Sequence, residues 1–330
     1  MSAVNATTPI LADDAALADA RAFNRKLAWA PRFKMRHRFM PMLIQGLLRA
    51  GQLNANSRLR RRGIAVQSMM AQADGHQVPV RMLRGAQPVS AVVLDFHGGG
   101  WAIGNAAMDD DQNAAFIDDC GVAVVSVDYR LAPGTPLAGI MADCLAAARW
   151  LLAGGVPSLN GLPVFVVGES AGGHLAAATL LQLKAWPELF RRIHGAILYY
   201  GVYDLTGTPS VHNAPRETLV LDGPGMPEAL RRLTPGLTDA ARRTAPLSPL
   251  YGDLSGMPPA WMCAGTLDPL RDDSIAMSAR WQEAAGCDMH LVPECPHGFI
   301  RFPTVLGRRA VGSSHAWLRA QLAGKLELTA

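Results

Sequence analysis

Five short apolar runs alternate with helical stretches through most of the chain, and this alternation restricts the possible folds more than any other feature. The runs are SAVVLDF, VAVVSVDY, VFVVGES, GAILYYGV and PAWMCAGT. Strands that are apolar at successive positions are covered on both faces of their sheet. Helices are predicted between them around residues 111–119, 138–152, 171–184 and 273–285, with a last helix over 304–326. The pattern predicts an α/β fold in which helices flank a mainly parallel central sheet.

Two segments interrupt this alternation, and we expect both to form a cap. The N-terminal residues 1–62 contain two helical stretches, followed by two early strands, IAVQSMM and VPVRMLRG. Residues 204–245 form an insertion after the sixth strand, with the turn DGPGMP and the helical stretch EALRRL. A long insertion between strands usually covers or shapes a site. We predict that both segments pack together over the strand ends of a catalytic domain formed by residues 63–203 and 246–330.

The cysteine spacing and the net charge exclude several classes of protein. Five cysteines lie far apart without a CxxC pair, which disfavours both a disulfide framework and a zinc site. They are Cys120, Cys144, Cys263, Cys287 and Cys295. We expect free thiols that are mostly buried. A net charge of +4 gives no strong electrostatic case for nucleic acid. The one dense basic run, RLRRRG at 58–63, is interpreted as a solvated turn before a strand.

The N-terminus and the hydropathy pattern predict a cytoplasmic protein without integral membrane association. The first residues lack the basic and apolar regions of a secretory signal. No apolar run approaches the roughly 18 residues that a membrane span requires. The basic and apolar stretch RHRFMPMLIQGLLRA, residues 36–50, leaves two interpretations open. It lies on a membrane surface, or it turns an apolar cap face towards the substrate or the core, which is the more ordinary explanation.

The hexapeptide GESAGG, residues 168–173, follows an apolar strand and opens an alanine-rich helix. Its G-x-S-x-G pattern, formed by Gly168, Ser170 and Gly172, makes a sharp strand-to-helix turn with the serine at the apex. The helix N-terminus brings partial positive charge to this point, which favours a developing anion. The flanking strand and helix favour a nucleophilic serine over the alternative, a plain glycine-rich turn.

A serine hydroxyl becomes a good nucleophile when a base removes its proton, and histidine is the usual base. His297 lies in ECPHGF, where proline and glycine mark a loop at a strand end. Such loops carry the catalytic groups of sheet enzymes. His174 lies one helical turn beyond Ser170 and is interpreted as a packing or cap-contact residue. His297 is therefore the predicted base.

The acid that orients the histidine is expected between the serine and the histidine in chain order. Asp268, in AGTLDPLRDD, occupies a loop after the strand PAWMC and is the predicted acid. Asp272 is the main alternative. Both Asp272 and Asp273 are typical of cap residues at the start of the next helix.

The stretch DFHGGGWAIG, residues 95–104, places three glycines after a histidine and a strand. A phosphate cradle is disfavoured, because the stretch lacks both the GxGxxG spacing and the GK[ST] of a P-loop. An acyl-transfer enzyme instead needs backbone N–H groups that stabilise an oxyanion. One comes from the residue after the nucleophile, here Ala171, and others come from a loop of the HGGG type. The glycines are therefore interpreted as part of an oxyanion hole.

Together these motifs resemble the hormone-sensitive-lipase-like family of α/β-hydrolases, the HGGG-type esterases of bacterial family IV. The matching stretches are HGGGW, VDYRLAP, GESAGG, DPLRD and HGF, in the family's order over about residues 64–322. The resemblance implies an α/β-hydrolase fold with an N-terminal helical cap, no cofactor, no metal and frequent homodimers. Two residues depart from the family's pattern: Glu169, where aspartate or threonine is commoner, and Gly134, where glutamate is usual.

The resemblance also implies a role for each matching residue. Ser170, Asp268 and His297 would be nucleophile, acid and base, and the amides of Gly99, Gly100 and Ala171 would bind the oxyanion. His97, Gly98, Trp101 and Glu169 would support the loop or line the pocket. The implied activity is that of a serine carboxylesterase for short- to medium-chain acyl esters of small molecules. The alternatives are an amidase, an arylacetamide-type deacetylase or peptidase with the same triad, and a ligand-binding relative without turnover.

Overall fold

A single twisted sheet forms the centre of the computed structural model, which describes residues 10–33 and 39–326. Eight strands of this described part pair in the order β1-β2-β4-β3-β5-β6-β7-β8. They are β1 (Ala65–Ala73), β2 (His76–Arg84), β3 (Val92–Phe96), β4 (Ala123–Val127), β5 (Val164–Glu169), β6 (Ile193–Tyr199), β7 (Ala260–Gly265) and β8 (Cys287–Val292). β2 pairs antiparallel with β1 and β4, and every other pair is parallel. The predicted mainly parallel sheet is confirmed.

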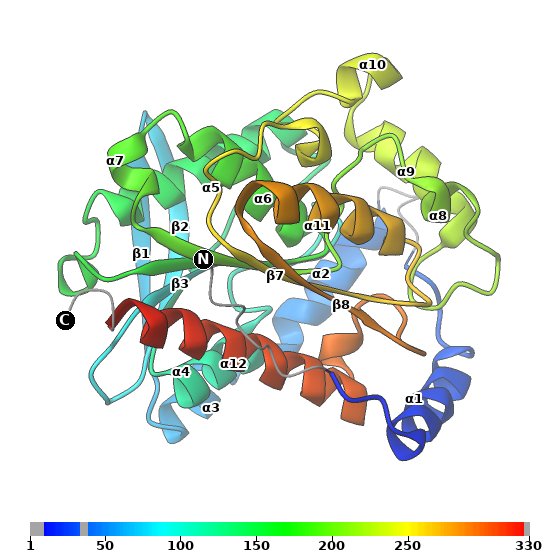
Figure 1. Ribbon diagram of the computed structural model, residues 1–330, viewed down its shortest axis with the longest axis horizontal. Coiled ribbons are helices and arrows are strands. Elements are labelled where there is room, and N and C mark those ends of the chain that lie inside the picture. Colours follow the sequence, from blue (N-terminus) through cyan, green and yellow to red (C-terminus); the bar gives the residue numbers. More distant parts are fainter. Residues whose placement is uncertain (1–9, 34–38, 327–330) are drawn as a thin grey trace.

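Helices cover both faces of this sheet (Figure 1). The longer ones are α1 (Asp14–Leu27), α2 (Phe39–Gly51), α4 (Asp110–Cys120), α5 (Leu137–Leu152), α6 (Ala171–Leu183), α11 (Arg271–Ala285) and α12 (Val305–Leu326). The short ones are α3 (Ala55–Arg61), α7 (Pro187–Phe190), α8 (Pro209–His212), α9 (Met226–Leu233) and α10 (Asp239–Arg242), with single 3-10 turns at Pro157–Leu159, Gly223–Gly225, Pro249–Tyr251 and Phe299–Arg301. α5, α6 and α11 lie on one face, and α4 and α12 lie on the other. Two apolar clusters, one on each face, form the core. All five cysteines are free thiols, and four of them are buried, as expected.

The basic run at 58–63 differs from its sequence interpretation. Arg58 to Arg61 lie in helix α3, so the prediction of a turn at these residues is wrong. Ala55 and Leu59, four residues apart, are both buried and give this short helix one apolar face that packs on β1. The arginines occupy the remaining, exposed faces. The sequence interpretation failed because a short helix with only two buried residues has too few apolar residues to show a helical pattern.

The two predicted cap segments meet at Phe33. The Phe33 amide donates to the carbonyl of Val220 (2.7 Å), and the Asp222 amide donates back to Phe33 (3.2 Å). α1, in contrast, packs against α12 on the far face of the sheet, where the Val305 amide donates to Asp19 (2.7 Å). Of the N-terminal segment, only the stretch around Phe33 contacts the insertion in this way, and α1 does not. The expectation that both segments pack together over the strand ends is therefore met only in part. The division of the chain into cap and catalytic domain stays a prediction.

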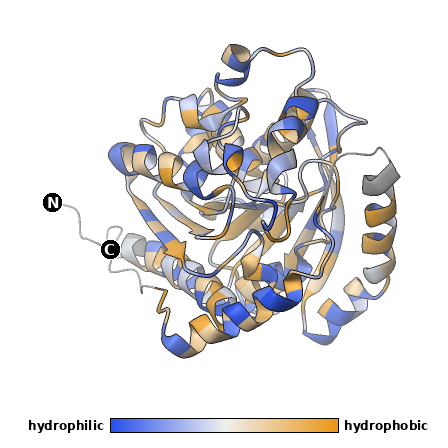
Figure 2. Ribbon diagram, turned by 90° about the vertical axis from the view of Figure 1, so that its right-hand side faces the viewer, coloured by the Kyte–Doolittle hydropathy of each residue, from blue (hydrophilic) through white to orange (hydrophobic). Residues whose placement is uncertain are grey.

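α2 half-buries one apolar side, with Ile44 and Leu48, and exposes another. The side chains of Leu43 and Leu47 are 62% and 67% exposed, and none of residues 43–51 is buried. The interpretation that this stretch turns its apolar side towards the substrate or the core is therefore met only in part, by Ile44 and Leu48, while residues 36–38 lie outside the described part. Figure 2 shows α2, largely orange, at the outer edge of the molecule. Within the described residues, no helix combines the length and apolar character needed to cross a membrane.

Candidate active site

Ser170 lies between β5, which ends at Glu169, and α6, which begins at Ala171. Its backbone angles, φ 53° and ψ −120°, are unusual for a residue with a side chain. The turn is tight because β3 lies directly beneath it: a Cβ on Gly172 would overlap the carbonyl oxygen of Phe96. The strained turn holds the hydroxyl clear of the sheet edge, in the geometry that the G-x-S-x-G pattern predicts.

The three residues predicted as nucleophile, base and acid lie in hydrogen-bond contact. His297 Nε2 is 2.8 Å from Ser170 Oγ, and His297 Nδ1 is 2.8 Å from Asp268 Oδ2. The other carboxylate oxygen of Asp268 accepts from the Leu270 amide (2.8 Å). Because an ionised carboxylate only accepts, Nδ1 carries the imidazole proton and Nε2 is free to accept from Ser170. The series can therefore move a proton from the serine to the histidine.

The rival carboxylates, Asp272 and Asp273, do not reach His297. Asp272 accepts from the Ser210 amide (2.9 Å). Asp273 is buried and accepts from the amides of Tyr203 (2.7 Å) and Asp204 (3.0 Å). Burial raises the pKa of Asp273 to about 7. Both residues are in the first turn of α11, but their carboxylates fasten the loop after β6 instead of capping their own helix, so the cap interpretation is wrong.

The glycine loop follows β3 and turns beside Ser170. Gly99, Gly100 and Trp101 all have positive φ, at 107°, 59° and 59°. A Cβ on Gly99 would overlap the carbonyl of Ile103, whose own amide donates to the Gly99 carbonyl (3.1 Å). Glycine is thus required where the backbone folds back on itself.

His97 supports this loop from below. Its Nδ1–H donates to the Gly98 carbonyl (2.7 Å), and the Tyr129 hydroxyl donates to the His97 carbonyl (2.6 Å). The ring is buried, and burial lowers the pKa of His97 to about 4. A neutral histidine tied to the loop backbone is compatible with a supporting position, and that role stays a prediction.

His174 is fully buried, which confirms its interpretation as a packing residue, but its individual partners were not predicted. Trp101 Nε1–H donates to His174 Nδ1 (3.2 Å), and His174 Nε2–H donates to the carbonyl of Leu247 (2.8 Å). Burial lowers the pKa of His174 to about 4, so the ring stays neutral with its proton on Nε2. His174 therefore connects the glycine loop to the segment that follows the insertion. In the sequence, only its position one helical turn beyond Ser170 indicated that His174 lies near the site.

Glu169, which precedes Ser170 and departs from the family's pattern, is buried in a charged cluster. Arg301 Nε lies 2.8 and 2.9 Å from the two oxygens of Glu169, and Arg301 also pairs with buried Asp109. The Tyr200 hydroxyl donates to Glu169 (2.9 Å), and its ring contacts the ring of His297 at 4.8 Å between centroids. Nearby Asp95 has its pKa raised to about 8, first by burial and then by the charge of Asp109. Arg301 was not predicted from the sequence.

We expect Arg301→Met to lower the free energy of unfolding by about 3–5 kcal/mol, because it leaves buried Glu169 and Asp109 without their cation. Arg62→Met is the matched control, since the pair of Arg62 with Asp118 is exposed and contributes about 1 kcal/mol at most. Urea unfolding of both variants measures the difference. Equal midpoints for the two variants would show that the buried cluster does not stabilise the fold.

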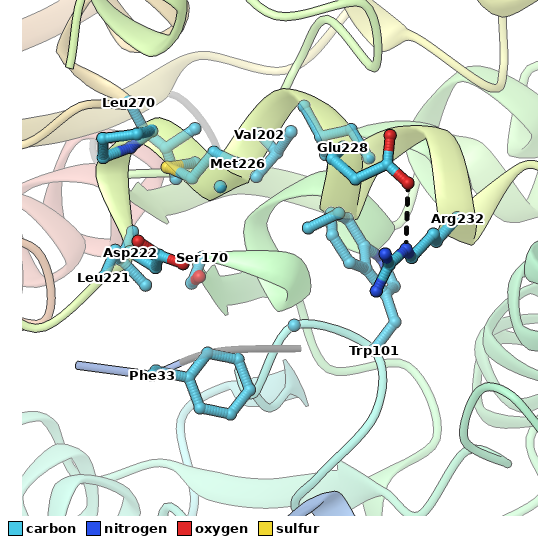
Figure 3. A pocket seen from close by; sticks show the side chains of 15 residues that line it. Phe33, Trp101, Ser170, Val202, Leu221, Asp222, Met226, Glu228, Arg232 and Leu270 are labelled. Atoms are coloured by element: carbon cyan, nitrogen blue, oxygen red, sulfur yellow. Dashed lines mark hydrogen bonds and ion pairs between the residues drawn. The ribbon is translucent and has the colours of Figure 1, made fainter. Parts of the chain in front are cut away.

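A cavity of about 390 Å³ opens beside Ser170. Figure 3 shows Ser170, Phe33 and Trp101 around it, with α9 along one wall. Its apolar lining comes from Phe33, Trp101, Val202, Leu221, Met226 and Leu270. Glu228 and Arg232 form an ion pair on α9 (3.0 Å) that also lines it. No group of three or more His, Cys, Asp or Glu in the described residues is arranged to hold a metal ion.

The comparisons with known proteins agree with this geometry. Residues 93–301 match a family model described as the alpha/beta hydrolase fold. The chain is 35% identical over 243 residues to carboxylesterase NlhH of Mycobacterium tuberculosis, covering 70% of this chain and 74% of that protein. It is 33% identical to an ethyl acetate hydrolase of Pseudomonas putida over 244 residues, 71% of this chain and 74% of the other.

Among solved structures, the chain is similar to an esterase from the bacterial hormone-sensitive lipase family. The TM-score is 0.69 at 25% identity, over 94% of this chain and 100% of the other. The matched residues include the strand-to-helix turn, the glycine loop and the loop of His297. The chain therefore belongs to the α/β-hydrolase family, in its hormone-sensitive-lipase-like branch of carboxylic ester hydrolases.

Proposed function

We propose that this protein is a serine carboxylesterase that hydrolyses short- to medium-chain acyl esters of small molecules through an acyl-serine intermediate. One observation carries the proposal: the hydrogen-bonded series Ser170–His297–Asp268 borders an apolar cavity large enough for a small ester. Carboxylesterase is also the printed name of the relative from Mycobacterium tuberculosis.

In the proposed mechanism, His297 takes the proton of Ser170 as the hydroxyl attacks the ester carbonyl. Asp268 holds the imidazole in the required tautomer and stabilises the imidazolium. The amides of Gly99, Gly100 and Ala171 stabilise the oxyanion, assisted by the N-terminus of α6. His297 protonates the leaving alcohol, and then activates a water that releases the acid from Ser170. Apart from the ester and this water, the proposed cycle uses only groups of the protein.

The cavity supports a preference for small acyl groups. A volume of about 390 Å³ is near the lower end of ligand pockets, which span roughly 300–1,000 Å³. Its walls are mostly apolar, and the ion pair of Glu228 with Arg232 adds a charged boundary on α9. The printed name of the relative from Pseudomonas putida, an ethyl acetate hydrolase, is consistent with a small acyl group.

The test is a series of p-nitrophenyl esters of increasing acyl length, with p-nitroanilides of the same acids in parallel. We expect kcat/KM to be highest at roughly two to eight carbons and to fall beyond, because longer chains exceed the cavity. We expect the anilides to react more slowly. Absence of turnover at every length would overturn the esterase proposal. Faster turnover of the anilides would favour the amidase alternative.

A further inference from the structure

Helix α2 exposes apolar side chains that nothing in the described structure covers. Leu43, Gly46, Leu47 and Ala50 are spaced three and four residues apart, so they share one face, and all four are exposed. Leu53, just beyond the helix, is 83% exposed. This face carries no charged residue. A helix with an exposed, uncharged apolar face normally has a partner surface.

The same part of the chain has a strong charge bias. Residues 20–73 contain twelve lysines and arginines and no aspartate or glutamate. The net charge of this segment is therefore +12, and that of the rest of the chain is −8, although the whole chain is only +4. Arg49 at the end of α2 and Arg58, Arg60 and Arg61 on α3 are exposed. Exposed leucines are thus followed within a few residues by exposed arginines.

Two pairs of amide hydrogen bonds hold α2 to the segment that follows β3. The side chain of Gln45 bonds both the amide and the carbonyl of Gly104 (2.8 Å each). Gln52 pairs in the same way with Asn105 (2.7 and 3.0 Å). These partners are the last residue of the glycine stretch 95–104 and the residue that follows it. These bonds fix the inner side of α2, and the leucine face consequently points outward.

The chemistry of this surface distinguishes among its possible occupants. A second copy of the chain, docked by a two-fold axis through α2, would bring two basic segments together, and their repulsion opposes this contact. Nucleic acid would match the arginines but would leave Leu43 and Leu47 without a partner. An anionic lipid surface matches both features, since acyl chains accept the leucines and headgroups attract the arginines.

We propose that α2 and α3 form an interfacial binding element, with Leu43, Leu47 and Leu53 entering an anionic lipid surface and Arg49, Arg58, Arg60 and Arg61 contacting its headgroups. The element would hold the enzyme peripherally and reversibly, because the apolar face is only two turns long. It would bring the active site to esters that concentrate at such a surface.

Co-sedimentation with vesicles tests the proposal on the full chain. Vesicles of phosphatidylcholine are compared with vesicles that also contain phosphatidylglycerol, at low and high salt. We expect binding to the anionic vesicles, weakened by salt because the attraction is screened. Leu43→Glu/Leu47→Glu should lower the binding about tenfold or more, because two charges replace the inserted side chains. Arg60→Glu/Arg61→Glu should lower it similarly and reduce its salt dependence.

Leu237→Glu/Ile275→Glu is the matched control, because it places the same two charges at exposed apolar positions outside α2 and α3. It should bind like the wild type, and all variants should hydrolyse a soluble p-nitrophenyl ester normally, which verifies folding. The proposal is overturned if the wild type does not bind anionic vesicles, or if the control loses as much binding as the α2 variant. It is also overturned if light scattering shows a wild-type dimer that Leu43→Glu/Leu47→Glu converts to monomer while vesicle binding is unchanged.

Discussion

Ser170→Ala is expected to lower kcat on p-nitrophenyl esters by about 10⁵- to 10⁶-fold, with little change in KM. The hydroxyl at the apex of the turn is the only oxygen that His297 Nε2 contacts in the described structure, at 2.8 Å. Without it, no acyl-enzyme forms, and hydrolysis falls back on water bound beside the oxyanion hole. The alanine itself should fold normally, because it keeps the Cβ atom and loses only the hydroxyl that bonds His297.

Two comparisons make this result specific. His297→Ala should lower kcat about as much as Ser170→Ala, and the double variant should be no slower than either, because the residues act as one unit. Ser278→Ala, which removes a buried hydroxyl that bonds the carbonyl of Ile275 on α11, should retain full activity. Substantial activity in Ser170→Ala, after a purification that excludes contaminating esterase, would show that another residue is the nucleophile.

The parts of the fold and site that the sequence predicted depend on local patterns. Apolar runs located the buried strands, and the glycines around Ser170 located the turn between β5 and α6. His297 and Asp268 could be predicted because each lies in a short loop after a strand, marked by proline or glycine. Parallel strands bring such loops to one edge of the sheet, so residues 127 positions apart in the chain meet at 2.8 Å.

Contacts that depend on distant segments could not be predicted in this way. Glu169 meets Arg301 from 132 positions away, and no local pattern identifies that arginine as its partner. Likewise, Asp273 could be recognised as an acidic residue in the first turn of α11, but not as the acceptor for the loop that follows β6. The exposure of Leu43 and Leu47 also depends on what lies beside α2, whereas the sequence reports only that the helix is apolar.

The charged cluster explains how the site tolerates Glu169 beside Ser170. In the proposed mechanism, an unpaired carboxylate at this position would oppose the developing oxyanion through a medium of low dielectric. Arg301 neutralises it through both Nε and Nη2, and the Tyr200 hydroxyl adds a further bond. Glu169, which differs from the family's commoner residues, is therefore paired with Arg301, four residues after His297.

Asp268→Asn should lower kcat by about 10⁴-fold, whereas Asp272→Asn should change it little, because only Asp268 contacts His297. The large loss follows from the hydrogen bonds of the loop. Asp268 Oδ1 accepts from the Leu270 amide, so an asparagine keeps its carbonyl oxygen there and presents its NH₂ group to His297. That NH₂ donates to Nδ1, the ring proton moves to Nε2, and His297 loses its ability to accept the proton of Ser170.

The two variants are isosteric with the wild type, so thermal unfolding should verify that both fold before their kinetics are compared. KM should remain close to the wild-type value in Asp268→Asn, because the ester binds before the tautomer matters. The decrease in kcat therefore reflects a less stable transition state, in which the imidazolium forms beside the substituted residue. A larger loss for Asp272→Asn than for Asp268→Asn would exchange their assignments, and it would require His297 to turn towards α11 when substrate binds.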